Sequence, residues 1–368
     1  MRVGIDASSI VGDRGGVGWH TYHLLRALVG LKEDVELVGY VAPGSLPNGA
    51  PQGWAADGGL RWVEAGRWLM PWRGTWDGLD LYHGPNFKMR TTGRFGGVVT
   101  VHDLWLDRHP EYSPKLFGQG SSSARARRTA WRAKKVLTVS NFSADDIADR
   151  YGLPRERIAV IPNGVSDEFR PVRDPAAFDA LRRRIGLPDA PYILFVGGAD
   201  PRKNHRALVR AFAKRAQELK EYRLVLVGDT VHRFGDMART VAQCGLESRT
   251  VCPGRLPIED IRHLYSHADL FVFPSRYEGF GMPVLEAMAC GAPVITSNCT
   301  ALPEVAGDAA VLVNPDDEEE LGERLVHVLG NPALRESLRA KGFDRARQFT
   351  WERAARQTVE VYKEVCGL

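Results

Sequence analysis

Short apolar runs alternate with longer segments of helical periodicity along the whole chain. Runs rich in Val, Ile, Leu and Phe, such as residues 2–7, 192–196 and 223–227, predict strands that are buried on both faces. In segments such as 19–31 and 205–218, apolar residues recur every three to four positions, which is typical of amphipathic helices. Strands that alternate with helices in this way predict an α/β protein with parallel sheets.

The alternation forms two blocks that meet near residues 170–175. We therefore expect two Rossmann-like, doubly wound domains, an N-terminal one over residues 1–170 and a C-terminal one over residues 171–350. A further helix is predicted within residues 351–368. Two such domains that face each other would place a ligand site in the cleft between them.

The segment 271–298 carries the densest candidate chemistry. It predicts a strand, a glycine-rich loop, a helix with Pro283 in its first turn, and a second strand. A helix that follows such a loop points free backbone N–H groups and the positive end of its dipole at whatever lies above it. We therefore interpret the segment as a site for an anion or for sugar hydroxyls, flanked by the carboxylates of Glu278 before the helix and Glu286 within it. The alternative is an ordinary core helix with acidic residues at the surface.

Two places in the N-terminal half are also candidates. Residues 15–18 are Gly-Gly-Val-Gly at a strand-to-helix turn, where Gly15 and Gly16 let a backbone approach a phosphate or a sugar. The run is not Gly-x-Gly-x-x-Gly, so it gives little support to a dinucleotide site. His102 follows the run 97–101, at the carboxyl end of a predicted parallel strand, which is the ligand edge of such a sheet. A structural histidine is the alternative there.

Aromatic and basic residues gather in two further segments. The first, in residues 62–76, contains Trp62, Arg67, Trp68, Trp72, Arg73 and Trp76. It suits sugar stacking or a membrane interface, or else its tryptophans pack beneath a loop. The second is a predicted helix over residues 121–135, with Arg125, Arg127, Arg128, Trp131, Arg132, Lys134 and Lys135. It suits an anionic lipid or a diphosphate acceptor, or else it is a solvated helix face.

Composition narrows the class of protein. The chain has 368 residues, of which 44% are hydrophobic and 26% charged, and a net charge of +4, which gives no support to a nucleic-acid partner. It contains neither an apolar run long enough to span a bilayer nor the apolar core of a signal peptide, so we expect a cytoplasmic protein. Five cysteines without a Cys-x-x-Cys motif suggest neither a disulfide framework nor a zinc site.

The run SRYEGFGMPVLEAMACGAPVITS resembles the Glu-x7-Glu signature of the retaining glycosyltransferases of family 4, which have the GT-B fold. Further segments resemble that family in the same order along the chain: GGVGWHTYHLLRAL, VVTVHDLW, VLTVSNFSADDIADRYGLPRERIAVIPNGV, FVGGADPRKNHRALVRAF and TWERAARQTVEVY. The resemblance covers nearly the whole chain. It implies two Rossmann-like domains facing across a cleft, with the acceptor in the first, the donor in the second, and a terminal helix that crosses back to the first.

The resemblance also implies roles for individual residues in the C-terminal domain. Glu286 is expected to hold the ribose hydroxyls of a nucleotide, and Glu278 to face the donor sugar. The backbone N–H groups expected to meet sugar hydroxyls and phosphate belong to Phe280, Gly281 and Met282. Lys203, with Arg202 beside it, is expected to neutralise the diphosphate leaving group.

The remaining implied roles concern three other positions. The loop with Gly15 and Gly16 is expected to close on the diphosphate, and His102 to lie near the reacting sugar. Many relatives carry arginine where this chain has Gly198 in its donor-binding loop. Arg202 is then expected to carry more of the phosphate charge.

The function implied is retaining transfer of a hexose from a nucleotide diphosphate sugar to a hydroxyl of a glycan or lipid-linked acceptor. Similarity to bacterial mannosyltransferases of polysaccharide and O-antigen assembly favours GDP-mannose as donor, with UDP-sugars and GDP-rhamnose as alternatives. No Asp-x-Asp motif is present, so we expect no metal and no other cofactor. The other functions considered are a nucleotide-sugar epimerase of the same architecture and a non-catalytic sugar-nucleotide binder. Contact with the inner membrane face is expected from the basic and aromatic segments.

Overall fold

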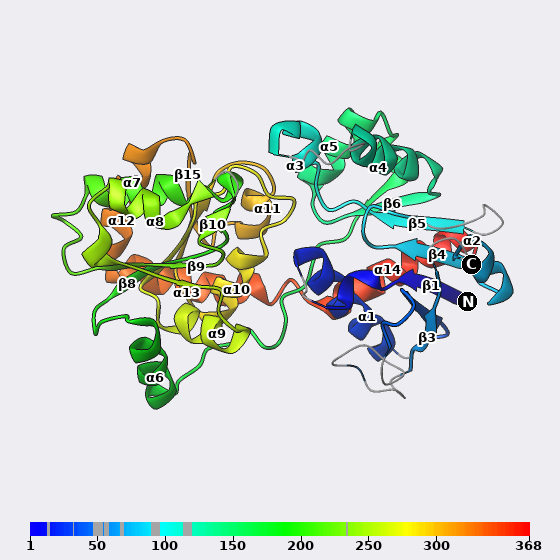
Figure 1. Cartoon of the computed structure of the whole chain (residues 1–368), viewed down its shortest axis with the longest axis horizontal. Coiled ribbons are helices and arrows are strands. Elements are labelled where there is room, and N and C mark those ends of the chain that lie inside the picture. Colours follow the sequence, from blue (N-terminus) through cyan, green and yellow to red (C-terminus); the bar gives the residue numbers. More distant parts are fainter. Residues whose placement is uncertain are drawn as a thin grey trace. The chain divides into compact units, whose positions relative to one another are not determined.

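The protein is represented by a computed structural model that describes residues 1–12, 15–31, 33–46, 54, 59–66, 70–89, 96–112, 120–232 and 235–368. The chain divides into two compact units, each built around a parallel sheet (Figure 1). Unit 1 is Met1–Gly164 with Thr350–Leu368, and unit 2 is Val165–Phe349. The two Rossmann-like sheets and the α/β class that the sequence predicts are confirmed.

The sheet of unit 1 has seven strands in the order β3-β2-β1-β4-β5-β6-β7. Its strands are β1 (Arg2–Asp6), β2 (Glu36–Val41), β3 (Arg61–Glu64), β4 (Leu81–Gly84), β5 (Gly96–Thr100), β6 (Lys135–Thr138) and β7 (Ile158–Val160). In β1, Val3 pairs in register with Leu37 of β2 on one side and Leu81 of β4 on the other. The strand order reverses between β1 and β4, which is where a doubly wound sheet opens toward a ligand.

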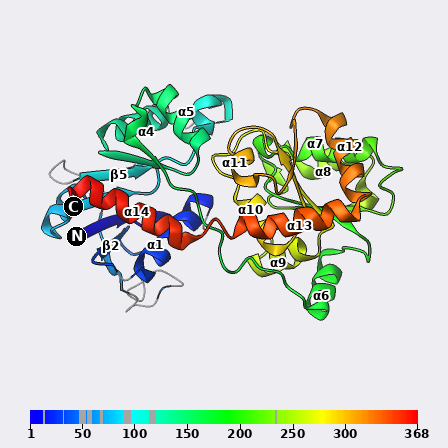
Figure 2. The same cartoon turned by 180° about the vertical axis from the view of Figure 1, so that it is seen from behind.

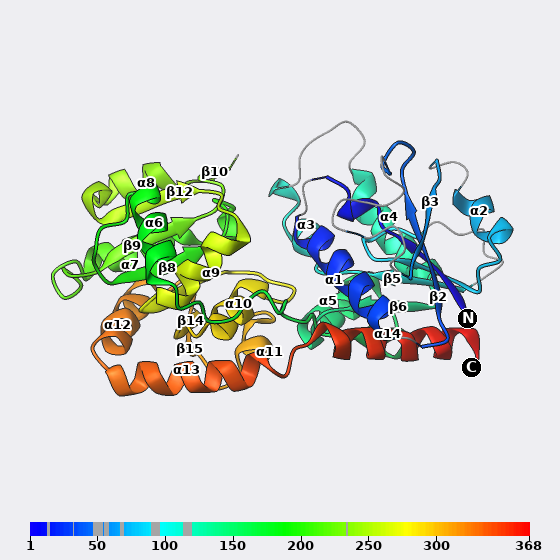
Figure 3. The same ribbon diagram turned by 90° about the horizontal axis from the view of Figure 1, so that it is seen from below.

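Two groups of helices cover the two faces of this sheet (Figure 1). Helices α1 (Gly16–Gly30) and α14 (Trp351–Cys366) share one core cluster and lie side by side (Figures 2 and 3). Helices α4 (Gly120–Arg132) and α5 (Asn141–Tyr151) belong to the opposite cluster. Shorter elements are η1 (Ser8–Ile10), α2 (Met70–Trp76), α3 (Trp105–Arg108), η2 (Pro110–Tyr112) and η3 (Arg155–Arg157).

A buried histidine ties the terminal helix α14 to the sheet. His83 Nδ1 lies 2.7 Å from the Tyr362 hydroxyl, and its Nε2 lies 2.8 Å from Thr100 Oγ1. His83 and Tyr362 are fully buried. Burial, followed by the nearby His102, lowers the pKa of His83 to about 3, so the ring is neutral at physiological pH.

We expect acidification to destabilise unit 1 through this histidine. The unfolded ring takes up a proton below its ordinary pKa of 6.5, whereas the folded His83 does not. The unfolded state therefore binds more protons, and the free energy of unfolding falls by about 1.4 kcal/mol per pH unit for such a residue, about 2 kcal/mol by pH 5. Urea unfolding between pH 8 and pH 5 measures this slope. His83→Gln should be less stable at pH 8 and show a shallower slope; equal slopes in the two proteins would contradict the assignment.

The sheet of unit 2 has six strands in the order β12-β9-β8-β13-β14-β15. They are β8 (Tyr192–Val196), β9 (Arg223–Val227), β12 (Thr250–Gly254), β13 (Leu270–Phe273), β14 (Val294–Ser297) and β15 (Val311–Val313), beside a small hairpin of β10 (Val231–His232) and β11 (Gly235–Asp236). The chain adds strands outward from β8 to β12, then returns and adds strands outward from β13 to β15. The strand order therefore reverses between β8 and β13.

The helices of unit 2 also lie in two groups. Helix α7 (His205–Lys214) packs against α8 (Met237–Gln243) and α12 (Glu318–Leu329), whereas α10 (Met282–Cys290) packs against α9 (Ile258–His267) and α13 (Pro332–Ala346). Right-handed crossovers put α7 and α8 on one face of the sheet and α9 and α10 on the other (Figure 1). The remaining helices are α6 (Pro175–Ile185), η4 (Pro201–Lys203), η5 (Glu247–Arg249) and α11 (Leu302–Ala306).

Some predicted elements differ from the observed ones. Helix α1 begins at Gly16 rather than at residue 19. Of the glycines in the predicted loop 15–18, only Gly15 lies outside the helix, where it is the N-cap residue in an extended conformation. The first unit ends at Gly164, against residue 170 in the sequence-based division. Strand β3 and helix α13 were not predicted. β3 is four residues long, and of the residues in α13 only Leu338, Gly342 and Ala346 are buried, so its apolar periodicity is faint.

Candidate functional site

The site of unit 2 lies at the reversal point of its sheet. The loop after β8 and the loop after β13 leave neighbouring strands at the same carboxyl edge, where open α/β sheets bind ligands. Their backbones are joined, because the N–H of Arg276 donates to the carbonyl of Arg202 at 2.8 Å. The hydroxyl of Ser275 lies 2.9 Å from the same carbonyl. Side chains far apart in the sequence therefore meet here.

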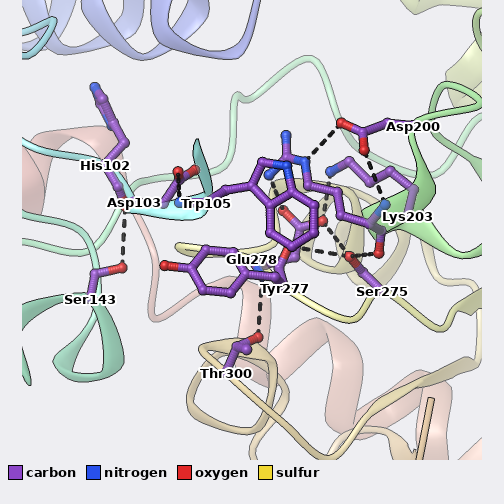
Figure 4. Close-up of polar contacts among 11 residues, drawn as sticks. His102, Asp103, Trp105, Ser143, Asp200, Lys203, Ser275, Tyr277, Glu278 and Thr300 are labelled. Atoms are coloured by element: carbon purple, nitrogen blue, oxygen red, sulfur yellow. Dashed lines mark hydrogen bonds and ion pairs between the residues drawn. The ribbon is translucent and has the colours of Figure 1, made fainter. Parts of the chain in front are cut away.

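A lysine and a glutamate form the centre of this site (Figure 4). Lys203 Nζ lies 2.6 Å from Glu278 Oε1, and Ser275 Oγ lies 2.8 Å from the same oxygen. The N–H of Glu278 donates to Thr300 Oγ1 at 3.2 Å, which fixes the backbone on the other side. Lys203 Nζ also lies 5.0 Å from the centre of the Phe273 ring. Residues of η4, of β13 and of the loops after β13 and β14 thus hold one carboxylate and one ammonium group in place.

The charges of this pair follow from burial and proximity. Glu278 is 6% exposed, and burial acts to raise its pKa, but the Lys203 and Arg202 cations outweigh burial and hold the pKa below its ordinary value. Burial lowers the pKa of Lys203, and the Glu278 carboxylate opposes that effect. Glu278 is therefore a carboxylate at neutral pH and is matched to a cation, as a buried charge must be.

The second cation, Arg202, is shared between two carboxylates. Its Nε lies 3.0 Å from Asp200 Oδ2, and its Nη1 lies 3.9 Å from Glu278 Oε2. The Asp200 carboxylate also accepts the backbone N–H of Arg202 at 3.0 Å. Arg202 is consequently held beside the Lys203–Glu278 pair, with part of its charge already neutralised by Asp200.

The start of α10 has the backbone geometry that the sequence predicts. Gly281 is its N-cap with φ 112°, and a Cβ there would lie 2.6 Å from Leu302 Cδ2, so only glycine fits. Pro283 lies in the first turn as expected. Among the residues that the structure describes, the N–H groups of Phe280, Gly281 and Met282 have no protein acceptor. These donors and the helix dipole can bind an anion or sugar hydroxyls.

Glu286 lies one turn further along α10 and is electrostatically different from Glu278. The Tyr265 hydroxyl of α9 donates to its Oε2 at 3.2 Å. Burial raises the pKa of Glu286 to about 7, and the Tyr265 hydrogen bond and the Lys203 charge oppose this only in part. Glu286 is therefore partly protonated at neutral pH. Further hydrogen-bond donors that reach it would favour its ionised form at neutral pH.

Gly198, the position where the resemblance to family 4 leads us to expect arginine, has no local steric reason to be glycine. A Cβ at this position would have its nearest neighbour at 3.7 Å, the Cβ of Asp229, which is ordinary contact. A Cβ would therefore fit at this position, so crowding next to the backbone does not require a glycine here.

The other three predicted site residues belong to unit 1. His102 follows β5, as predicted, and its Nε2–H donates to the carbonyl of Pro85 at 2.8 Å, so Nδ1 is its acceptor nitrogen (Figure 4 shows the side chain). Burial lowers its pKa, which keeps the ring neutral. Its ring lies 4.5 Å from that of His20 on α1. Gly15 and Gly16 are exposed at the start of α1, and no described atom lies within 4 Å of a Cβ at either position.

Sequence reasoning missed three residues that shape the site of unit 2. Ser275 and Thr300 hydrogen-bond Glu278, and Tyr265 hydrogen-bonds Glu286. Ser275 directly follows the predicted strand and could have been suspected from that position. Nothing in the sequence distinguishes Thr300 or Tyr265 from other polar residues.

The aromatic and basic segments of unit 1 are partly structural. Trp62 packs over Gly39, and the indole N–H of Trp131 donates to the carbonyl of Tyr151 at 2.8 Å. Trp72 and Trp76, one helical turn apart on α2, are 59% and 68% exposed. Along α4 and after it, Arg125, Arg127, Arg128, Arg132 and Lys134 are exposed, whereas Lys135 pairs with Glu364 at 2.6 Å. Arg67 and Trp68 lie outside the described residues, and the side chain of Arg73 is not described either.

Two features are absent from the residues that the structure describes. No helix in them has both the length and the apolar character that crossing a membrane requires. In the same ranges, no three His, Cys, Asp or Glu side chains are grouped so that they could hold a metal ion.

The fold and the site define a class of protein: a GT-B protein, with a nearly buried, cation-matched carboxylate and a helix start at the reversal point of its second sheet. Residues 177–345 match the family described as glycosyl transferases group 1, and residues 14–169 match the one described as glycosyltransferase family 4. The chain is 36% identical over 306 residues to O-antigen chain mannosyltransferase B of Escherichia coli, which covers 82% of this chain and 80% of that protein. The chain belongs to glycosyltransferase family 4 and is a glycosyltransferase.

Solved structures of the same fold are similar over almost the whole chain. Sucrose-phosphate synthase from Thermosynechococcus elongatus superposes with a TM-score of 0.78 at 22% identity, over 99% of this chain and 98% of that one. Anabaena Alr3699/HepE in complex with UDP-glucose superposes with a TM-score of 0.73 at 20% identity, over 99% of each chain. At these identities the likeness establishes the fold.

Proposed function

We propose that the protein transfers mannose from GDP-mannose to a hydroxyl of a glycan or a lipid-linked acceptor, with retention at the anomeric carbon and without a metal ion. The observation that carries this proposal is the Lys203–Glu278 pair, 2.6 Å apart, beside the N–H groups at the start of α10. The choice of mannose rests on the relative from Escherichia coli, which is named a mannosyltransferase. A UDP-sugar donor is the alternative, since the Anabaena protein was solved with UDP-glucose.

In this proposal, different residues of the site bind different parts of the donor. Glu286, whose pKa is raised to about 7, gains its full charge when the two ribose hydroxyls donate to it. The N–H groups of Phe280, Gly281 and Met282 bind the phosphates and the sugar. Lys203 and Arg202 neutralise the diphosphate as it departs, and Glu278 accepts a hydrogen bond from the sugar.

In the proposed reaction, the bond between the anomeric carbon and the diphosphate oxygen breaks, and a bond from the same carbon to the acceptor oxygen forms on the same face of the sugar. The acceptor proton passes to the departing phosphate oxygen, and GDP leaves. No side chain then acts as nucleophile, so catalysis consists of positioning and of stabilising the charge that develops on the diphosphate. A covalent intermediate on a carboxylate is the alternative route to retention.

A thermal-shift panel tests the donor. A ligand that binds only the native state raises the apparent melting temperature by mass action. At equal concentrations we expect GDP to raise it more than UDP or ADP does. A larger shift with UDP would replace GDP-mannose by a UDP-sugar in this proposal.

We expect donor affinity to rise with pH through Glu286. Because the ribose hydroxyls require the ionised carboxylate, binding releases a proton where the free residue is protonated. With a pKa of about 7 in the free protein, affinity should improve about tenfold between pH 6 and pH 8 and level off above that. Calorimetric titration with GDP-mannose measures this, since its diphosphate lacks the terminal ionisation of GDP. Glu286→Gln is the matched control and should bind weakly and independently of pH; an unchanged pH dependence in that variant would rule out Glu286 as the origin.

Metal independence rests on the supply of positive charge by the protein. A diphosphate leaving group requires cations, and Lys203, Arg202 and the start of α10 provide them without a carboxylate pair for Mg²⁺. Turnover should therefore persist in EDTA. Loss of turnover in EDTA that Mg²⁺ or Mn²⁺ restores would contradict this part of the proposal.

The acceptor is proposed to be presented at an anionic membrane surface. The exposed arginines of α4 attract anionic headgroups, and Trp72 and Trp76 on α2 suit the interface between headgroups and acyl chains. Liposomes that contain phosphatidylglycerol should bind the protein at low salt and release it at high salt. The absence of binding at low salt would exclude this contact.

A further inference from the structure

An exposed ion pair lies at the carboxyl edge of the sheet of unit 2, and the function proposed above gives it no role. Arg255 Nε lies 2.5 Å from Asp229 Oδ1, and its Nη2 lies 2.7 Å from Asp229 Oδ2. This is the two-pronged geometry in which a guanidinium and a carboxylate fix each other's orientation. The side chains are 68% and 49% exposed. Both side chains are therefore oriented and at the same time accessible to a ligand.

The pair lies on loops that continue the line of the donor site. Asp229 follows β9 and Arg255 follows β12, the two strands beyond β8 in the sheet. The backbone joins these loops, since Gly228 N–H donates to the Gly254 carbonyl at 2.9 Å and Ala199 N–H to the Asp229 carbonyl at 2.8 Å. Gly228 has φ 135°, and a Cβ there would lie 2.3 Å from the carbonyl oxygen of Gly197, so the loops touch through their backbones. The edge is therefore one continuous surface.

The order of groups along this edge matches the order of groups in a nucleotide sugar. Glu278 after β13 pairs with Lys203 after β8; Asp229 and Arg255 follow on the next two strands. Neighbouring strands lie about 4.8 Å apart, so the second pair is roughly 10–15 Å from the first. A donor with its sugar and diphosphate at Lys203 and Glu278 would extend its base toward the second pair. This step rests on the proposed function.

The chemistry of the pair selects among bases. Ionised aspartate only accepts hydrogen bonds, and its two oxygens match two adjacent donors. Guanine presents such donors as N1–H and the N2 amino group, and its O6 and N7 are acceptors that suit arginine. Uracil presents a single N–H between two carbonyls, and adenine presents its amino group beside an acceptor nitrogen. Of the three, guanine fits both members of the pair.

We propose that Asp229 and Arg255 recognise the guanine base of the donor. Guanine takes the place of Arg255 as the hydrogen-bond partner of Asp229, through N1–H and the N2 amino group. Arg255, released from the carboxylate, donates to O6 and N7. In the absence of donor, the ion pair keeps both side chains at the edge in an orientation close to the one they use.

Inosine diphosphate tests this assignment, because it differs from GDP only by the missing N2 amino group. We expect the protein to bind GDP about tenfold or more tightly than inosine diphosphate, as measured by calorimetric titration. Asp229→Ala should weaken GDP and bring the two nucleotides within about threefold of each other. Arg255→Gln should weaken both together, since both carry O6 and N7. Asp308→Asn, which breaks the exposed Lys341–Asp308 pair at 2.9 Å, is the matched control and should keep the ratio of the wild type.

The outcomes separate this inference from the proposed function. If Asp229→Ala keeps the wild-type preference for GDP over inosine diphosphate, Asp229 does not read the amino group and the inference is overturned, while the GDP donor stands. If the wild-type protein binds UDP or ADP more tightly than GDP, the GDP donor and the guanine-reading pair both fall. Circular dichroism of each variant confirms that a change in affinity does not come from unfolding.

Discussion

Glu278→Gln should lower the turnover of the donor by roughly 10²–10³-fold while nucleotide binding stays close to that of the wild type. The substitution keeps the shape of the side chain and removes its charge. Glu278 is ionised in the free protein because Lys203 and Arg202 hold its pKa below the ordinary value against the effect of burial. Because this negative charge is kept in a nearly buried position, we expect it to stabilise the transition state of sugar transfer.

The measurement is the release of GDP from GDP-mannose, with and without a lipid extract as acceptor. Calorimetric titration with GDP reports nucleotide binding separately, so that a loss of turnover can be assigned to the chemical step. Asp308→Asn serves again as the matched control, because it removes a carboxylate from an exposed pair. Turnover of Glu278→Gln within about threefold of the wild type would remove Glu278 from the mechanism.

Lys203→Gln should be comparably damaging, but with a different signature. It removes the cation that we propose to lie nearest to the diphosphate, and it leaves Glu278 without its closest partner. The pKa of Glu278 should then rise, because burial is no longer opposed by Lys203. We expect a turnover loss of roughly 10²–10³-fold at neutral pH, weaker GDP binding, and a pH profile displaced to higher pH.

Comparison with Arg202→Gln makes this prediction specific. Arg202 lies 3.9 Å from Glu278 and shares its charge with Asp200, so its loss should cost less than that of Lys203. Lys203→Arg should recover part of the activity, since it restores the charge without the compact ammonium. A larger loss in Arg202→Gln than in Lys203→Gln would show that Arg202 is the principal phosphate cation. It would be the residue that compensates for Gly198.

The predictability of the fold differs between elements for physical reasons. Helix α10 could be located from sequence because Pro283 and Gly291 mark its two ends, and the apolar runs of β8 and β9 could be delimited to the residue. Helix α13 could not, since its few buried residues leave no clear periodicity. The start of α1 was predicted too late, because the glycines that open it are poor helix formers in isolation.

The features of the site likewise differ in whether the sequence alone could predict them. The resemblance to family 4 implied different tasks for Glu278 and Glu286, and those tasks stay predictions. The structure shows that the two carboxyl groups have different pKa shifts and different hydrogen-bond partners. The contact between Lys203 and Glu278 depends on the reversal of strand order between β8 and β13, which no local pattern reveals. The contributions of Ser275, Thr300 and Tyr265 likewise arise from tertiary packing. The expected cleft, and the approach of His102, Gly15 and Gly16 to the donor, stay predictions.

Proton NMR of the protein with GDP-mannose in EDTA, without acceptor, tests the donor and the retention together by following slow transfer of mannose to water. We expect GDP-mannose to be consumed and α-mannose to appear before the β-anomer forms by mutarotation, with Glu278→Gln nearly inactive. First appearance of β-mannose would contradict retention. Consumption of a UDP-sugar while GDP-mannose stays intact would contradict the proposed donor.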